Sequence, residues 1–171
     1  KVVTRFAPSP TGTLHIGGVR TASFNYIYAK QNNGDFLVRI EDTDRERSTK
    51  AYEKNILDTL SSIGLSPDKK PINQSERNDI YIKAAEQIIA SGDAYWCDCS
   101  EEDLEKMRNQ QMADGKKPMY DGRSRDLGLE RSSNTVLRLA TPEDGEIVMH
   151  DMIRGEIRFN NAELDDLILL R

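Results

Sequence analysis

The sequence predicts an α/β protein whose first part is a parallel strand–helix–strand unit of the kind that binds nucleotides, followed by a small α+β module. Three observations predict this class. A short apolar segment near the N-terminus leads into a turn of Pro and Gly and then into a helical pattern. A second apolar segment ends in a group of carboxylates. After residue 99 the pattern changes to short strands between turn residues.

The first expected element is a buried strand over Val2 to Ala7. The segment Pro8 to Gly12 cannot continue a central strand, because proline lacks the N–H that a sheet needs, so a turn is expected there. From Gly18 to about Lys30 the apolar side chains recur at helical spacing, and Asn32-Asn33-Gly34 ends the helix. This order places His15 at the N-terminus of that helix.

The second expected strand, Asp35 to Ile40, completes a βαβ unit. Carboxylates at Glu41, Asp42 and Asp44 follow its C-terminal end. Ligands of open α/β sheets bind at the carboxyl ends of the strands. We therefore expect this end of the sheet to line a site.

Two helices and a strand are expected next. Ser48 is suited to cap a helix whose apolar stripe runs from Tyr52 through Ile56 and Leu60 to Ile63 and which stops at Gly64. A further helix runs from about Asn78 to Ser91 and stops at Gly92, and the next strand is expected at Tyr95-Trp96-Cys97.

The second module begins after residue 99, so we expect domains at 1–99 and 100–171. Ser100 with Asp103 resembles a capping box that opens a polar helix through about Ala113. Turn residues then separate four short strand candidates, at 136–139, 147–149, 157–159 and 167–170.

The bulk composition is that of a folded globular chain. Of its 171 residues 31% are charged and 37% are apolar, and the net charge of −5 argues against a generic basic nucleic-acid binder. No apolar run reaches the length of a membrane span and no signal peptide is evident, so we expect no membrane partner and a cytoplasmic location. The start at Lys1 and the end at Arg171, inside an apolar run, lead us to expect a fragment.

The chemistry of the first turn centres on His15. An imidazole and unpaired backbone N–H groups at a helix N-terminus favour an anion, and a ring donor there can stabilise phosphate oxygens that gain charge in a transition state. Gly17 and Gly18 would allow a ligand to approach the backbone. The alternative is a plain glycine turn beside a solvated histidine, and these residues alone leave the choice open.

A longer pattern resembles one family. The run Arg5-Phe-Ala-Pro-Ser-Pro-Thr-Gly-Thr-Leu-His-Ile-Gly-Gly18, with Arg39-Ile-Glu-Asp-Thr-Asp44, is similar to the signature of glutamyl-tRNA synthetases, which are class I aminoacyl-tRNA synthetases. The likeness continues through Gln74–Arg77, Gly92–Tyr95, Tyr120–Arg123, Asp151–Gly155 and Asp165–Arg171. The turn resembles the glutamyl enzymes more than the glutaminyl ones. The resemblance implies that the chain contains half of a Rossmann-like catalytic domain, followed by an incomplete acceptor-binding insertion.

The resemblance assigns the ATP site. It implies that His15, Gly17 and Gly18 bind ATP and take part in catalysis, with Gly18 in the last position of the His-x-Gly box. Many class I enzymes carry a second histidine there, so this chain has one donor fewer.

The resemblance also assigns the glutamate site. It implies that Arg5 pairs with the substrate carboxylate, while Ser9 and Glu41 hold the α-amino and α-carboxylate groups. A guanidinium offers a planar fork to a carboxylate, which agrees with that role. Without the family, Arg5 and Glu41 would more often form a structural ion pair or solvated strand ends.

Four further residues are candidate tRNA contacts. Asp44 is expected to face the tRNA end, although its run also suits a helix-start loop. Arg77, Arg123 and Arg154 are candidates for acceptor-stem phosphates, although loop arginines are usually only solvated.

Cys97 and Cys99 raise the question of metal, because they lie too close for an ordinary disulfide within one strand. Some relatives complete a zinc knuckle with a distal Cys-x-His after a Tyr-Asp-Gly-Arg segment. Here Ser124 and Asp126 occupy that position, and a serine hydroxyl is a poor zinc ligand. We therefore expect no bound metal.

The resemblance implies a glutamate–tRNA ligase that uses ATP with Mg²⁺ and forms glutamyl adenylate before transfer to the glutamate tRNA, with the glutamine tRNA an open alternative. A Lys-rich signature loop and an anticodon-binding region are implied but do not occur in these residues, so we expect this chain to be inactive alone. Alternatives are the glutamyl-queuosine tRNA synthetase paralogue, a small-molecule nucleotidylyltransferase and a non-catalytic tRNA-binding fragment.

Overall fold

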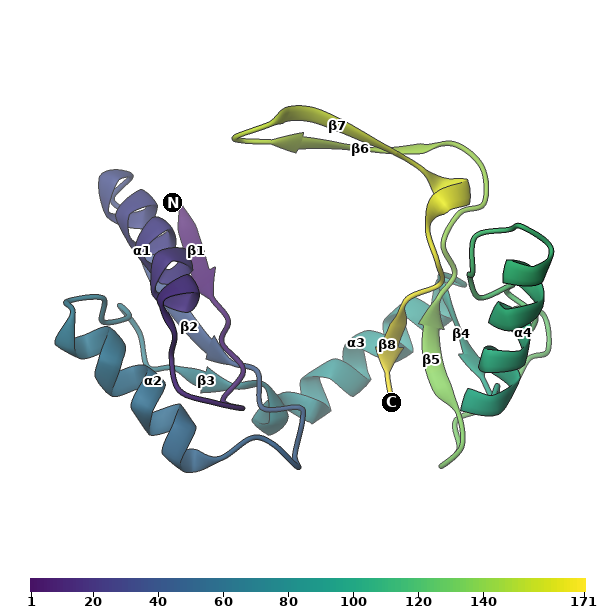
Figure 1. The fold of residues 1–171 in the computed structure, drawn as a ribbon, viewed down its shortest axis with the longest axis horizontal. Helices are drawn as coiled ribbons and strands as arrows, with labels where there is room; N and C mark the ends of the chain where they lie inside the picture. The colour runs from purple at the N-terminus through teal and green to yellow at the C-terminus, as the bar shows by residue number, and fades with distance from the viewer. The chain divides into compact units, whose positions relative to one another are not determined.

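The computed structural model describes residues 1–171 and divides into two compact units, Lys1–Asp79 and Ile80–Arg171 (Figure 1). No helix in either unit combines the length and the apolar character that crossing a membrane would require.

The first unit contains a parallel three-stranded sheet in the order β1-β2-β3. Its elements are β1 (Val3–Phe6), α1 (Ile16–Gln31), β2 (Asp35–Ile40), α2 (Lys50–Ser62), β3 (Ile72–Asn73), the 3₁₀ turn η1 (Gln74–Arg77) and the start of α3 (Asn78–Ala90). The expected strand–turn–helix–strand order is confirmed, and β2 has the bounds that the alternating pattern indicated.

One face of this sheet carries the core of the first unit. Side chains alternate across the strands, so Phe36, Val38 and Ile40 of β2 are all buried on one side. Helix α1 contributes Ala22 and Ala29 to this core, and α2 contributes Ile56 and Leu60. The opposite face is open in this chain, where Val3 and Ile72 remain 56% and 39% exposed.

The ends of α1 and α2 follow from short signals. Helix α1 ends before Asn33, which adopts a positive φ of 50°, and Gly34 lies so close to Val2 that a Cβ would meet its carbonyl oxygen at 2.3 Å. The expected cap of α2 was wrong by one residue. Thr49 is the N-cap, accepting from the N–H of Tyr52, because its backbone is extended there and its hydroxyl reaches the first turn.

Two elements of the first unit were not expected from the sequence. Strand β3 has only two residues, too few to show an alternating pattern. The 3₁₀ turn η1 follows it directly and is held to the end of β2 by Asp42, as described below. Long-range contacts, rather than a local pattern, define both elements.

The second unit combines an antiparallel sheet, β4-β5-β8, with a separate hairpin, β6-β7. Its elements after α3 are β4 (Ala94–Cys97), α4 (Glu101–Ala113), β5 (Val136–Leu139), β6 (Glu146–Asp151), β7 (Gly155–Asn160), the 3₁₀ turn η2 (Asn161–Glu163) and β8 (Ile168–Leu170). The capping box of Ser100 and Asp103 at the start of α4 is confirmed. Strand β4 pairs with β5, and the proposed domain boundary after residue 99 stays a prediction.

A buried polar network accompanies the apolar core of the second unit. Asp166 is only 4% exposed and accepts hydrogen bonds from Arg125, from the Thr141 N–H at 3.1 Å and from the Tyr95 hydroxyl. Burial raises the pKa of Asp166, but these donors outweigh burial and hold the pKa below its ordinary value. The network connects β4, the segments on either side of β5 and the segment before β8.

Candidate functional site

The turn between β1 and α1 surrounds a cavity of about 340 Å³ in the first unit. Ser9, His15, Gly17 and Gly18, four of the residues that the sequence singled out, line it. Phe6 at the end of β1 and Ile56 of α2 form part of its apolar wall. The structure therefore brings the expected ATP residues and one expected glutamate residue to one place.

His15 is the N-cap of α1, as the sequence indicated. Its ring nitrogen Nδ1 accepts a hydrogen bond from the Gly17 N–H at 3.1 Å. A neutral imidazole that accepts at Nδ1 carries its proton on Nε2. The cap therefore fixes the tautomer and leaves the Nε2–H free to donate to a ligand at the positive end of the helix dipole.

A Cβ at either of the two glycines, Gly17 or Gly18, would press on a neighbouring side chain of the protein. A Cβ on Gly17 would lie 2.9 Å from Cε1 of His15, and a Cβ on Gly18 would lie 2.7 Å from Cδ1 of Leu14. Larger residues would displace the imidazole and the leucine. The expectation that these glycines let a ligand approach is not tested by this geometry.

The two charged residues expected to bind glutamate have different surroundings. Glu41 follows β2 and forms an ion pair with Arg39, and its backbone N–H donates to Pro8 O at 2.9 Å. Arg5 is exposed on β1 and makes no ion pair. The structure therefore contains no ion pair between Arg5 and Glu41. The partner of Glu41 is Arg39, which the sequence did not indicate. Arg39 is the penultimate residue of β2 and Glu41 directly follows the strand, so their spacing of two residues was the available signal.

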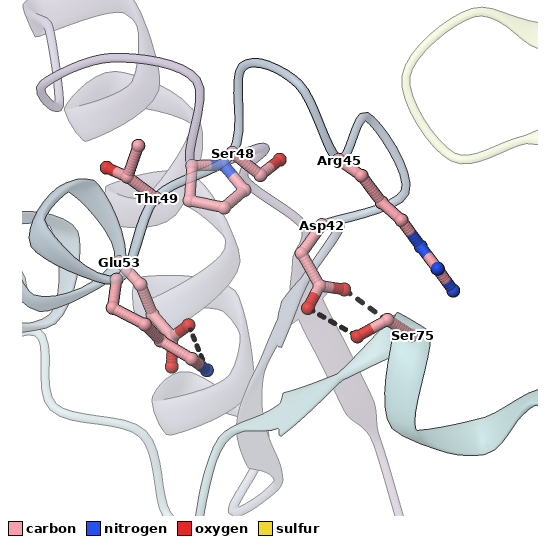
Figure 2. Close-up of a pocket in the computed structure, with 8 residues that line it drawn as sticks. Asp42, Arg45, Ser48, Thr49, Glu53 and Ser75 are labelled. Carbon is pink, nitrogen blue, oxygen red and sulfur yellow. Dashed lines mark hydrogen bonds and ion pairs between the residues drawn. The ribbon is translucent and has the colours of Figure 1, made fainter.

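Asp42 holds the end of β2 to the segment after β3 (Figure 2). Its carboxylate accepts from the Ser75 N–H at 2.9 Å, from the Ser75 hydroxyl at 2.6 Å and from Asn73 at 3.2 Å, and Asn73 also donates to Glu53 at 3.0 Å. Burial raises the pKa of Asp42, but these hydrogen bonds outweigh burial and lower it. Asp42 therefore has a structural task, beside a cavity of about 300 Å³ that Arg45 also lines.

The candidate tRNA contacts lie on separate elements. Asp44 accepts from Arg47 at both its backbone and its side chain, which lowers the pKa of Asp44. Arg77 lies in η1 of the first unit. In the second unit, Arg123 is paired with Asp121 at 2.7 Å, and Arg154 lies in the exposed turn between β6 and β7. Their tRNA roles stay predictions.

The two cysteines share a polar cluster with Tyr120 in the second unit. The Tyr120 hydroxyl lies 3.3 Å from Sγ of Cys97 and 3.9 Å from Sγ of Cys99, and the Ser124 hydroxyl lies 3.7 Å from Cys99. Asp126 is exposed and outside this cluster. The donor set is two thiols and two neutral hydroxyls, which does not fit a four-ligand structural zinc site.

Comparisons with known proteins give a consistent family. The family described as tRNA synthetases class I (E and Q), catalytic domain, matches residues 1–171. Glutamate–tRNA ligase 1 of Bartonella henselae is 50% identical over 99% of this chain and 36% of its own length. The glutamate–tRNA ligase of Oleidesulfovibrio alaskensis is 48% identical over all of this chain and 37% of its own length.

Solved structures agree with the sequence relatives. The glutamate tRNA ligase of Elizabethkingia meningosepticum, determined in complex with its amino acid, superposes with a TM-score of 0.85 at 39% identity and covers 98% of this chain. The glutamate–tRNA synthetase of Elizabethkingia anophelis gives a TM-score of 0.86 at the same identity. In both, this chain corresponds to 38% of the neighbour.

Proposed function

Because the chain belongs to the class I tRNA synthetases of the glutamate and glutamine type, within their catalytic domain, we propose that the protein containing it ligates glutamate to tRNA. The chain spans little more than a third of the curated relatives it matches. The proposed reaction has two steps. The glutamate α-carboxylate attacks the α-phosphorus of MgATP and pyrophosphate leaves. A hydroxyl of the terminal ribose of tRNA then attacks the acyl carbon of glutamyl adenylate, forming the ester and releasing AMP.

The observation that carries this proposal is the cap of α1 by His15. Its Nδ1 is occupied by the Gly17 N–H, so its Nε2–H is the proton available to a ligand. In the proposed site this donor and the N-terminus of α1 stabilise charge on the ATP phosphates as pyrophosphate departs. Orientation and charge stabilisation then account for the chemistry, with no covalent intermediate on the enzyme.

The proposed glutamate site uses Arg5, Ser9 and Glu41. Arg5 is free of carboxylate partners, so its guanidinium is available to the substrate carboxylate as a bidentate donor. The Glu41 carboxylate already pairs with Arg39, and the Glu41 backbone N–H bonds to Pro8 in the turn that contains Ser9. In the proposed complex Glu41 accepts from the substrate ammonium while keeping this contact.

The proposal extends to tRNA through Asp44, Arg77, Arg123 and Arg154. Arginine side chains bind phosphates by charge-assisted hydrogen bonds, and such contacts position a tRNA without reading its sequence. The glutamate tRNA is the proposed substrate, and charging of the glutamine tRNA is a further outcome to measure. The two free thiols agree with a proposed cytoplasmic location, where cysteines stay reduced.

The experiment is glutamate-dependent exchange of pyrophosphate into ATP, measured with added tRNA on the full-length protein that contains residues 1–171. Exchange with glutamate, followed by an ester of glutamate on the 3′-terminal ribose, supports the proposal. Exchange that proceeds without any tRNA product would instead indicate a small-molecule nucleotidylyltransferase. Glutamate attached to a modified internal base would indicate the queuosine-directed paralogue, and no exchange with retained tRNA binding would indicate a binding protein.

A further inference from the structure

The turn Pro8–Leu14, which leads into His15, is attached to other elements at three points. The Glu41 N–H donates to Pro8 O at 2.9 Å, and the Thr49 N–H donates to Pro10 O at 3.1 Å. Both of these bonds join backbone to backbone. The third joins the Leu14 N–H to the side-chain oxygen Oδ1 of Asn55 at 3.1 Å, across 41 residues of sequence.

Asn55 is well placed to hold this turn rigidly. It lies within α2, next to Ile56, which is 1% exposed and belongs to the core of the first unit. Ile56 also lines the cavity that contains His15. The packing of α2 therefore fixes the position of the Asn55 side chain relative to the turn.

Asn55 holds Leu14, the residue next to His15, which is the N-cap of α1. The side chain of Leu14 packs against the core, and its Cδ1 would lie 2.7 Å from a Cβ on Gly18. Leu14 directly precedes His15 in the chain, so the two residues share a peptide bond. Movement of Leu14 would displace the His15 backbone and with it the bond from the Gly17 N–H to the ring.

We propose that Asn55 is a positioning residue for the His15 site. It acts through Leu14, by keeping the His15 ring, which lines the cavity, in the orientation in which Nδ1 accepts from the Gly17 N–H and Nε2–H stays free. Asn55 itself touches no ligand in this proposal. The expected effect of Asn55 on turnover rests on the proposed function. Its expected effect on the position of the His15 ring rests only on the contact with Leu14.

The structural test uses residues 1–171. Replacing Asn55 by Ala should speed hydrogen exchange at the Leu14 amide about tenfold and change the His15 ring from the single Nε2–H form to a mixture of tautomers, read by ¹⁵N NMR. Asn55→Asp keeps an oxygen acceptor and should preserve both signals. Unchanged exchange and an unchanged ring in Asn55→Ala would overturn the proposal.

The kinetic test uses the full-length protein. Asn55→Ala should lower the turnover of glutamate-dependent pyrophosphate exchange about five- to tenfold while leaving the KM for glutamate within twofold. Asn55→Asp should restore turnover to within about twofold of wild type. Alanine is the better helix former, so a weaker α2 would not explain the loss.

The matched control is Asp58→Ala, which removes an exposed residue of the same helix and its pair with Lys54. It should leave turnover unchanged. Wild-type turnover in Asn55→Ala would overturn the positioning role and leave the proposed function intact. A wild-type protein that catalyses no exchange with glutamate would instead overturn the proposed function, and the kinetic role of Asn55 with it.

Discussion

Replacing Cys97 by Ser should weaken the fold in a manner that depends on pH. Cys97 is fully buried, and burial alone would raise the pKa of its thiol. Hydrogen bonds from the Tyr120 hydroxyl, the Cys99 backbone N–H, Ser124 and Arg138 outweigh burial and lower the pKa to about 7. In the neutral form the Cys97 thiol donates to the Tyr120 oxygen at 3.3 Å, which also accepts from the Ser124 N–H at 3.1 Å; the thiolate instead accepts from the tyrosine hydroxyl.

The sign of the pH effect follows from the lowered pKa. The folded state favours the thiolate, so its contribution to the free energy of unfolding is complete above the ordinary cysteine pKa of about 9 and disappears as pH falls through about 7. Two pKa units correspond to roughly 3 kcal/mol. Serine cannot ionise in this range and loses that contribution.

The assay is urea unfolding of residues 1–171 in reducing buffer at pH 6.5 and pH 9.5, for wild type and Cys97→Ser. The difference between the two proteins should widen by about 2 kcal/mol at the higher pH. Titrations of groups that Cys97 does not contact cancel in this difference, whereas the substitution also removes the part of the raised pKa of Cys99 and of Tyr120 that Cys97 causes. A difference of equal size at both pH values would refute the reasoning, because it would mean that Cys97 remains a neutral thiol in the fold.

Three further outcomes are expected. Ile56→Ala should reduce the free energy of unfolding by about 2–5 kcal/mol in a urea titration, because Ile56 is buried in the core. Ile63→Ala, at a site that is 47% exposed, should reduce it by less than about 1 kcal/mol. Equal losses in the two variants would contradict the assigned core. In the full-length protein His15→Ala should lower turnover of pyrophosphate exchange about 100-fold with little change in the KM for glutamate, and unchanged turnover would remove the ring from the mechanism. Arg5→Ala should instead raise the KM for glutamate by at least tenfold, about 1.4 kcal/mol, and an unaltered KM would exclude its role as carboxylate partner.

Local patterns predicted the elements of the fold that have local causes. The alternation in Asp35–Ile40 and the capping box at Ser100 depend on neighbouring residues, and both appear where the sequence indicated. The cap of α2 was assigned to Ser48 instead of Thr49 because adjacent hydroxyl residues are equivalent in a pattern and differ only in backbone geometry.

The contacts that the sequence did not indicate are those between distant segments. Nothing near Asp42 in the chain signals that Ser75 will donate to it twice, and nothing near Leu14 signals its bond to Asn55. Strand β3 exists because it pairs with Arg39 and Ile40 of β2. The site residues themselves were named from a signature, and the geometry supplied the tautomer of His15 and the Arg39 partner of Glu41.

The three-stranded sheet of the first unit has an open edge along β1, and one of its faces still exposes Val3 and Ile72. An unpaired strand beside apolar side chains is a template on which a second polypeptide can add a strand. Arg5 lies in the same strand, so such an addition would place a second chain beside the guanidinium without disturbing the core behind it. A concentrated preparation of this chain can therefore lose access to Arg5 through self-association while its helices and strands remain intact, and loss of ligand binding should be read together with particle size.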